Sequence, residues 1–349
     1  MQARTHRWRT RRSTATIAAV LVAAISLAGC GSSGTSGGSA SGKGASLKLE
    51  DYLSSQEPWT GWAQNLVTKV STDTGGAVQI KVFPDGQLVS QSGALQAIRS
   101  RSVDLGVVPD IAGGELAPGF SVADGPFFTS TWDQSAAITK SDQVRDYQNT
   151  LLKPFKLRLL ASCTEGFNYL LTQQPIHSMA DLKGLKIRVP DQQSADEVSA
   201  IGATPVTIAI GDVYEALQLH TVVGAYSALT NFYSQHWYEA AKNVDLIPLS
   251  MSYVDLVMNL DAWNGLSATQ QQKVSADAAG AVQACSTAEQ GETKKIESEI
   301  EAGGAKLVQP PDIQPFVDAT ANLRGKQTSA SKAAKDLTAL ENTAAGIDN

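Results

Sequence analysis

Short apolar runs alternate along the chain with segments whose apolar residues recur at helical spacing. Residues 78–83 alternate strictly between apolar and polar side chains, which predicts a half-buried strand. The segment before it begins at Pro58, a residue favoured in the first turn of a helix, and places Trp62, Leu66 and Val70 on one face. Together the patterns predict alternating strands and helices at 47–52, 58–74, 78–83, 92–100 and 103–108. This order is typical of a parallel sheet with helices on its faces.

A second unit with the same layout begins near residue 157. An Ala-rich segment that begins at Ser267, a favoured residue type for a helix start, predicts a long helix to about Glu301. We expect this helix to bend or break near Gly280 or Gly291. The patterns therefore predict the α/β class, with two lobes, each a mostly parallel sheet with flanking helices, and a ligand-binding cleft between them. The other elements expected in this unit are strands at 157–162, 167–172, 184–190, 204–208, 222–225, 246–249 and 254–260, and helices at 196–201 and 213–219.

The N-terminal residues predict an export signal, a lipid attachment site and a tether. Five arginines precede an apolar run at 17–27, which is too short to span a bilayer and has the length of a signal-peptide core. The following Leu-Ala-Gly-Cys resembles a bacterial lipobox, which implies that residues 1–29 are removed and that Cys30 receives a lipid. Residues 30–45 are rich in Gly and Ser and predict a flexible linker. We expect the mature protein at the outer face of the cell membrane or in the periplasm, exported by the Sec or the twin-arginine route.

Charge and motif content exclude several classes of function. After residue 29 the chain has 23 basic and 34 acidic residues, a net charge of −11, so we expect no nucleic-acid partner. The sequence has no metal-ligand spacing, Gly-rich phosphate loop or catalytic constellation at strand ends, so we expect no metal, no cofactor and no enzymatic activity. Besides Cys30, only Cys163 and Cys285 are cysteines, and both a disulfide and two buried thiols are compatible with the predicted compartment.

A series of motifs between residue 76 and about residue 281 resembles the solute receptors of TRAP transporters, the tripartite family typified by C4-dicarboxylate uptake. The most specific motif is Asp-Leu-Lys-Gly-Leu-Lys-Ile-Arg-Val-Pro at 181–190. The resemblance implies a receptor that binds a small organic acid and delivers it to integral-membrane transporter subunits, and we expect a monomer. Further motifs in the family's order are Val-Phe-Pro-Asp-Gly-Gln-Leu at 82–88, Gly-Pro-Phe-Phe at 125–128, Glu-Gly-Phe at 165–167 and Val-Tyr-Glu-Ala-Leu-Gln at 213–218.

The resemblance also implies which residues form the ligand site. Arg188 matches the arginine whose planar guanidinium binds both oxygens of the ligand's carboxylate. Asn168 stands where many members have a second arginine, and Ser227 where an asparagine often helps to hold the carboxylate. Val108 and Pro109 correspond to polar positions of sugar-acid receptors, and Ile210 to an apolar or aromatic wall of the pocket.

These departures from the family's pattern bear on the ligand. A sugar acid would leave hydrogen bonds unmade, and a dicarboxylate would lack a second cation, so we expect a monocarboxylate with an apolar or aromatic body. Trp59 and Tyr226, just past expected strand ends, are candidate stacking faces. We expect Asp110 at the cleft, and Glu165 either orienting Arg188 or lying at the hinge. The alternative to a transport receptor is a ligand-sensing lipoprotein of the same fold that signals.

Two crossover segments, near 159–163 and 250–258, are expected to form a hinge between the lobes. We expect lobe I to comprise 46–162 and 253–290, and lobe II to comprise 163–252 and 291–349. Closure of the cleft would then follow from ligand contacts with both lobes, while the open state is favoured without ligand.

Overall fold

The structure is a computed structural model that describes residues 44–53, 55, 58–309 and 312–347. These residues belong to one compact unit, Gly42–Asn349. The predicted signal peptide, the lipidation site at Cys30 and nearly all of the predicted linker lie outside the described residues. Among the described helices, none combines the length and the apolar character that crossing a bilayer requires.

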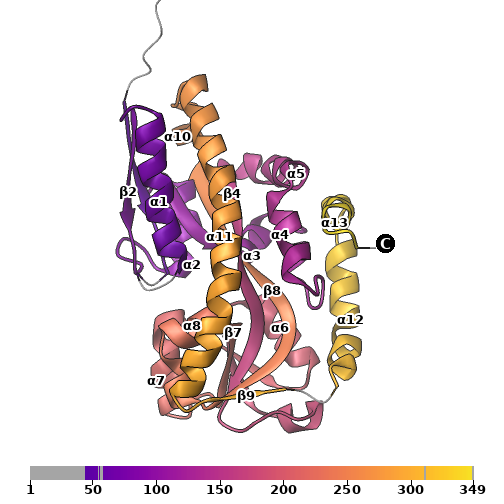
Figure 1. Cartoon of the computed structure of the whole chain (residues 1–349). Coiled ribbons are helices and arrows are strands. Elements are labelled where there is room, and N and C mark those ends of the chain that lie inside the picture. The colour runs from indigo at the N-terminus through magenta and orange to yellow at the C-terminus, as the bar shows by residue number, and fades with distance from the viewer. Residues whose placement is uncertain (1–43, 54, 56–57, 310–311, 348–349) are drawn as a thin grey trace, which may run out of the picture. The chain divides into compact units, whose positions relative to one another are not determined.

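A mixed sheet connects the two halves of the described chain (Figure 1). Its strand order is β2-β1-β3-β8-β4-β7-β5-β6, and β9 pairs with β8. The set β2-β1-β3 is parallel and belongs to the first lobe, whereas the set β7-β5-β6 is parallel and belongs to the second. Between them β4 and β8 pair antiparallel with each other. The strands are β1 (Ala45–Glu50), β2 (Val78–Phe83), β3 (Leu105–Pro109), β4 (Leu157–Thr172), β5 (Lys186–Val189), β6 (Thr204–Thr207), β7 (Gly224–Ala228), β8 (Asn243–Asn259) and β9 (Lys306–Val308).

The two long strands β4 and β8 correct the prediction of four short strands. Each was divided in the prediction because a polar stretch interrupts its apolar residues: Thr164-Glu165-Gly166 in β4 and Ser250-Met251-Ser252 in β8. In the structure the strands continue through these stretches, and their pairing shifts register beside Gly166 and again before Leu170. The polar residues therefore mark where the shared strands pass a polar cavity, and do not mark strand ends.

Helices cover the sheet, and each lobe has a hydrophobic core of its own. Leu49 and Leu105 of the first lobe's strands pack with Trp59 in one core, and Ile187 of β5 packs with Val198 in another. The α-helices are α1 (Pro58–Asp73), α2 (Gln91–Arg99), α3 (Asp110–Leu116), α4 (Trp132–Lys140), α5 (Asp142–Leu152), α6 (Gln192–Ala200), α7 (Val213–Gln218), α8 (Leu229–Ser234), α9 (Trp237–Ala240), α10 (Leu260–Asn264), α11 (Ala268–Ala302), α12 (Gln314–Ser329) and α13 (Lys332–Ala345). The 3₁₀ turns are η1 (Val122–Asp124), η2 (Lys153–Phe155), η3 (Met179–Leu182) and η4 (Ile210–Asp212).

Helix α11 is continuous over 35 residues, so the expected bend or break is absent. A Cβ atom at Gly280 or Gly291 would meet no atom within 4 Å, so neither glycine is required by a close contact. Glycine costs about 1 kcal/mol relative to alanine in a helix, which packing of α11 against α1, β4 and α8 offsets. A capping box between Ser267 and Gln270 begins the helix as predicted. Because α1 belongs to the first lobe and α8 lies beside β7 in the second, α11 contacts both lobes (Figure 1).

A disulfide joins Cys163 of β4 to Cys285 of α11, with the two Cα atoms 6.0 Å apart. Of the two alternatives that the sequence left open, the structure thus has the bonded one. Both cysteines are buried in the core of the first lobe.

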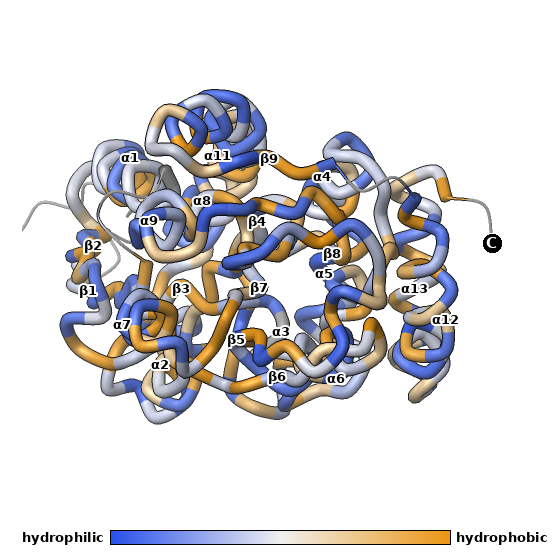
Figure 2. Tube along the Cα trace, turned by 90° about the horizontal axis from the view of Figure 1, so that it is seen from below, coloured by the Kyte–Doolittle hydropathy of each residue, from blue (hydrophilic) through white to orange (hydrophobic). Residues whose placement is uncertain are grey.

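The C-terminal helices α12 and α13 pack along the same side of the described unit (Figure 1). Helix α12 contacts α6, whereas α13 contacts α4 and α5. Figure 2 shows both hydrophilic and hydrophobic residues on α11, α12 and α13, as expected for helices with one face against the protein. The exact residue limits of the two lobes stay a prediction.

Candidate functional site

A cavity lies where β4 and β8 pass between the lobes, with about 590 Å³ of space between atoms when the open solvent at its mouth is included. It continues into an open groove of about 1690 Å³. The first lobe contributes Pro109 at the end of β3, and the second contributes Arg188 and Pro190 at the end of β5. Carboxyl ends of parallel strands from both lobes therefore meet at this cavity, as expected for open α/β sheets.

Arg188 is the basic residue among the described residues that line the cavity. Its neighbours Ile187 and Val189 point into the core of the second lobe, so the alternation of the strand turns Arg188 to the opposite face. Its Nε donates a hydrogen bond to the carbonyl oxygen of Ile208 at 2.9 Å, and the guanidinium carbon lies 5.3 Å from the ring centre of Trp237. Burial lowers the pKa of Arg188 to about 10, so the side chain remains charged at neutral pH.

A second polar group surrounds Glu165 on β4. Its two carboxylate oxygens accept hydrogen bonds from Asn231 Nδ2 at 2.8 Å and from Ser252 Oγ at 2.7 Å. Burial raises the pKa of Glu165, and these two hydrogen bonds and the charge of Arg188 oppose that rise. Gly166 has a φ of +142° at the register shift next to it, a conformation that a residue with a side chain rarely adopts. This local bulge positions Glu165, which acts on Arg188 through its charge.

Tyr226 and Glu197 form a third group. The Tyr226 hydroxyl donates a 2.6 Å hydrogen bond to Glu197 and accepts one of 2.6 Å from Ser250 Oγ. Ser250 Oγ in turn accepts from Asn168 Nδ2 at 3.1 Å. Burial raises the pKa of Glu197 to about 8. Tyr226 thus contributes a buried hydroxyl that is already hydrogen-bonded, whereas the sequence analysis expected a stacking face.

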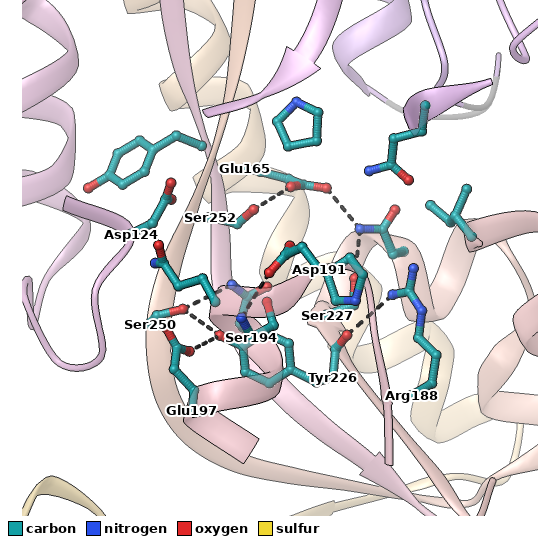
Figure 3. A pocket seen from close by; sticks show the side chains of 18 of the residues that line it. Asp124, Glu165, Arg188, Asp191, Ser194, Glu197, Tyr226, Ser227, Ser250 and Ser252 are labelled. Atoms are coloured by element: carbon teal, nitrogen blue, oxygen red, sulfur yellow. Dashed lines mark hydrogen bonds between the residues drawn. The ribbon is translucent and has the colours of Figure 1, made fainter. Parts of the chain in front are cut away.

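Two further carboxyl groups line the cavity (Figure 3). Asp191 begins α6 and accepts a hydrogen bond from the backbone N–H of Ser194 at 2.8 Å. Asp124 ends the turn η1, and burial and neighbouring carboxyl groups raise its pKa well above the usual range. Its Oδ2 has no hydrogen-bond partner among the described residues.

Most of the predicted site residues come together in the structure. The six that line the cavity are Glu165, Asn168, Arg188, Ile210, Tyr226 and Ser227.

Three predicted residues lie elsewhere. Trp59 is not past a strand end but in the first turn of α1, where it packs in the core with its ring centre 4.1 Å from that of Trp62. Val108 points into the core because side chains alternate along β3, and the next residue, Pro109, lines the cavity instead. Asp110 lines a smaller neighbouring cavity and is hydrogen-bonded to Asp124.

The sequence analysis missed several lining residues, above all the acids Asp124, Asp191 and Glu197 and the serines of β8. A signal existed for Asp191, which directly follows the proline that ends β5, and for Ser250 and Ser252, which alternate with buried residues. The sequence contains no such signal for Asp124 or Glu197, because their burial results from tertiary packing. In the described part of the chain, no group of His, Cys, Asp or Glu side chains is arranged to hold a metal ion.

Two lobes with a polar cavity between them are an architecture suited to binding a small solute. The chain belongs to the bacterial extracellular solute-binding proteins of family 7, whose family model matches residues 49–329. These are receptors of TRAP-type transporters, not enzymes.

Individual relatives agree with this assignment. The sialic acid-binding periplasmic protein of Vibrio cholerae is 24% identical over 262 residues, which cover 74% of this chain and 80% of that protein. The 2,3-diketo-L-gulonate-binding periplasmic protein of Escherichia coli is 27% identical over 254 residues, 71% of this chain and 76% of that protein.

Solved structures share the fold. An extracytoplasmic solute receptor of Bordetella pertussis that binds pyroglutamic acid superposes with a TM-score of 0.81 at 18% identity, covering 86% of this chain and 99% of that chain. A TRAP periplasmic solute-binding protein of Bradyrhizobium in complex with galacturonate gives a TM-score of 0.81 at 23% identity, covering 86% and 100%.

Proposed function

We propose that this protein is the extracytoplasmic receptor of a TRAP-type transporter and that it binds a small organic acid with one carboxylate at Arg188. The observation that carries the proposal is a buried, charged guanidinium held by backbone carbonyls at the wall of the cavity between the lobes. A guanidinium fixed in this way can bind a carboxylate with two parallel hydrogen bonds and loses little conformational freedom on binding.

A single ligand carboxylate fits the charges of the cavity. The other charged residues among its described lining are acids, and a second carboxylate would be buried near them without a cation. This supports a monocarboxylate over a dicarboxylate.

The walls favour a polar body for the ligand, in place of the apolar or aromatic body inferred from the sequence. Ile210 and the prolines 109 and 190 are aliphatic, whereas serines, amides and carboxyl groups form much of the remaining lining. Asp124 Oδ2 and Asn231 Oδ1 have no hydrogen-bond partner among the described residues, and an apolar body would leave them buried in that state, which costs about 1–3 kcal/mol for each. The relatives whose names state a ligand include receptors of sialic acid, pyroglutamic acid and galacturonate.

The cellular context of the proposal comes from the N-terminal motifs. The receptor would be a monomer, anchored through a lipid on Cys30 at the outer face of the membrane, and would deliver its ligand to integral-membrane transporter subunits. Mass spectrometry of Cys30 tests the anchor. Co-purification with membrane subunits of a transporter supports delivery, whereas co-purification with a signalling protein would favour a sensing role.

Thermal unfolding in the presence of acids tests ligand binding. The panel spans monocarboxylates with apolar, hydroxylated and aminated bodies, together with dicarboxylates and neutral sugars. A ligand at 100 times its dissociation constant stabilises the fold by about 2.7 kcal/mol, which raises the unfolding temperature by several degrees.

We expect a monocarboxylate to give this rise and Arg188→Gln to remove it. Arg158→Gln, which changes a half-buried arginine outside the cavity, serves as the control. Stabilisation by neutral sugars alone, or undiminished binding in Arg188→Gln, would contradict the proposal.

A further inference from the structure

We propose that the acid bound at Arg188 also has a positively charged nitrogen, so that the ligand is a zwitterion such as an amino acid or a betaine. The inference rests on the proposed function and specifies its substrate class. The carboxylate of the ligand lies at Arg188, and its cationic nitrogen lies against Asp124 and Glu197.

The balance of charge in the cavity favours a ligand with a cationic nitrogen. Its described lining has one guanidinium and four carboxyl groups, at Asp124, Glu165, Asp191 and Glu197. Two of these, Glu165 and Asp191, are stabilised in their ionised form by the charge of Arg188. A ligand carboxylate would use the same guanidinium and would add a negative charge to an acidic cavity.

The second argument is the surroundings of the remaining two carboxyl groups. Asp124 is hydrogen-bonded to the carboxyl group of Asp110, and the charges that raise its pKa are those of Asp255, Asp191 and Glu197. Those that act on Glu197 are Asp191 and Asp196. All are acidic, so the described part of the chain provides no positive charge at this end of the cavity. A cation that entered there would be attracted by several carboxyl groups at once in a buried environment, where such attraction is strong.

The third argument is an unused hydrogen-bond acceptor. Asp124 is only 7% exposed, and although its side chain is hydrogen-bonded to the carboxyl group of Asp110, its Oδ2 has no hydrogen-bond donor among the described residues. A buried polar atom without a donor is costly, and the ammonium group of an amino acid supplies the N–H donors that this oxygen lacks, whereas a betaine contributes its charge alone. The described residues form no metal-binding group here, so an organic cation fits the site better than a metal ion.

The fourth argument is the separation of the two kinds of charge. In Figure 3, Asp124 and Glu197 lie on one side of the group of side chains and Arg188 lies on the other. A molecule with a carboxylate at one end and a cationic nitrogen at the other matches this arrangement.

The competing explanation is that the carboxyl groups are protonated and donate hydrogen bonds to the hydroxyl groups of an uncharged body. The two explanations differ in what binding does to protons. A bound cation favours the ionised carboxylates and therefore releases protons from Asp124 and Glu197, whose pKa values burial raises. An uncharged body leaves these protons in place.

Isothermal titration calorimetry with matched pairs of compounds distinguishes the two. The first pair is glycine betaine and 3,3-dimethylbutanoate, which have the same shape and differ in charge. The second is L-proline and cyclopentanecarboxylate. A third set compares ω-amino acids with one to five methylene groups between the charges with the corresponding plain acids. The protein is the exported chain with Cys30→Ser, titrated at pH 7 in two buffers of different ionisation enthalpy to count released protons.

We expect at least one aminated acid to bind about tenfold or more tightly than its uncharged partner and to release protons. Asp124→Asn and Glu197→Gln should each weaken binding of that compound about tenfold or more and leave binding of its uncharged partner unchanged or improved. The matched controls are Asp133→Asn and Glu301→Gln, which alter exposed acids on α4 and α11. Circular dichroism establishes that each variant is folded, and Glu197→Gln keeps the test valid if Asp124→Asn does not fold.

The other outcomes separate this inference from the proposed function. Equal or tighter binding of the uncharged partners, with unchanged affinity in both acid variants and loss in Arg188→Gln, would overturn the zwitterion and leave the carboxylate receptor standing. Binding of no carboxylate of either set would overturn both.

Discussion

Burial at the cavity favours the uncharged form of acidic residues while it leaves Arg188 charged. The pKa of Glu197 is raised to about 8, whereas that of Arg188 is lowered only to about 10. At neutral pH, Arg188 is therefore a fixed positive charge, and Glu197 can respond to its surroundings. A bound ligand can therefore change the ionisation of Glu197 at neutral pH. An exposed carboxylate is already ionised at this pH, so a ligand would not change its charge.

The stability of the empty receptor should depend on pH through Glu197. Between its ordinary value of 4.5 and about 8, the native state retains a proton that the unfolded state has lost, so stability falls as pH rises. Relative to Glu197→Gln, the wild-type free energy of unfolding should fall by up to about 1.4 kcal/mol per pH unit between pH 5 and 8.

Urea unfolding of both proteins at four pH values in this range measures the difference. The exposed Glu301→Gln controls for the removal of a carboxyl group. Wild-type and Glu197→Gln curves that run parallel would show that Glu197 is not linked to folding in this way.

A site residue can be predicted from the sequence when residues close to it in the chain determine where its side chain points. Arg188 lies in a contiguous ten-residue motif that includes β5, and the alternation of this strand is sufficient to direct its side chain. Asp124 becomes a site residue only because η1 packs against β8, more than a hundred residues later in the chain. No local pattern contains that contact, so prediction from the sequence could not include it.

At the scale of elements, local periodicity predicted α1, α2, β2 and β3 well, and failed where an element serves both lobes. β4 and β8 have buried residues on both faces, so they lack the alternation that identifies a strand, and their cavity-facing polar stretches resemble loops. The interior glycines of α11 suggested a break for a similar reason. Packing against elements of both lobes keeps β4, β8 and α11 continuous. The residues that make these contacts are distant in the sequence, so a pattern over about ten residues does not contain them.

The disulfide between β4 and α11 should contribute substantially to stability. It closes a segment with a sequence separation of 122, and a closed loop of this length restricts the unfolded chain by up to about 5 kcal/mol in the chain-entropy account. The double variant Cys163→Ala, Cys285→Ala should therefore unfold about 2–5 kcal/mol more easily.

Urea unfolding with and without a reducing agent measures this effect. The wild-type protein should lose stability on reduction, and the double variant should not respond. Alkylation of both cysteines in the folded, unreduced wild-type protein would contradict the bond.

At the scale of the whole described unit, the cavity is shared by two lobes that are joined by a small number of elements. β4 and β8 run through both lobes, α11 packs on both, and α12 and α13 contact different parts of the unit. The register shifts of β4 at Gly166 and before Leu170 interrupt its ladder with β8 beside the cavity. A further shift lies between Leu159 and Ala161, and strands can bend where their ladder is interrupted, while the hinge near 159–163 and 250–258 stays a prediction.

Ligand binding should therefore close the groove between the lobes. Arg188 and Glu197 are second-lobe residues, whereas Pro109 ends β3 of the first lobe, so a ligand in the cavity contacts both lobes and stabilises the form in which they are close. Small-angle scattering should show a smaller radius of gyration when a ligand identified by thermal unfolding is present at saturation. Arg188→Gln at the same ligand concentration should keep the value of the free protein. If calorimetry shows that the wild-type protein is saturated while its scattering stays unchanged, then the lobes form a rigid body and the ligand enters a cavity that is already formed.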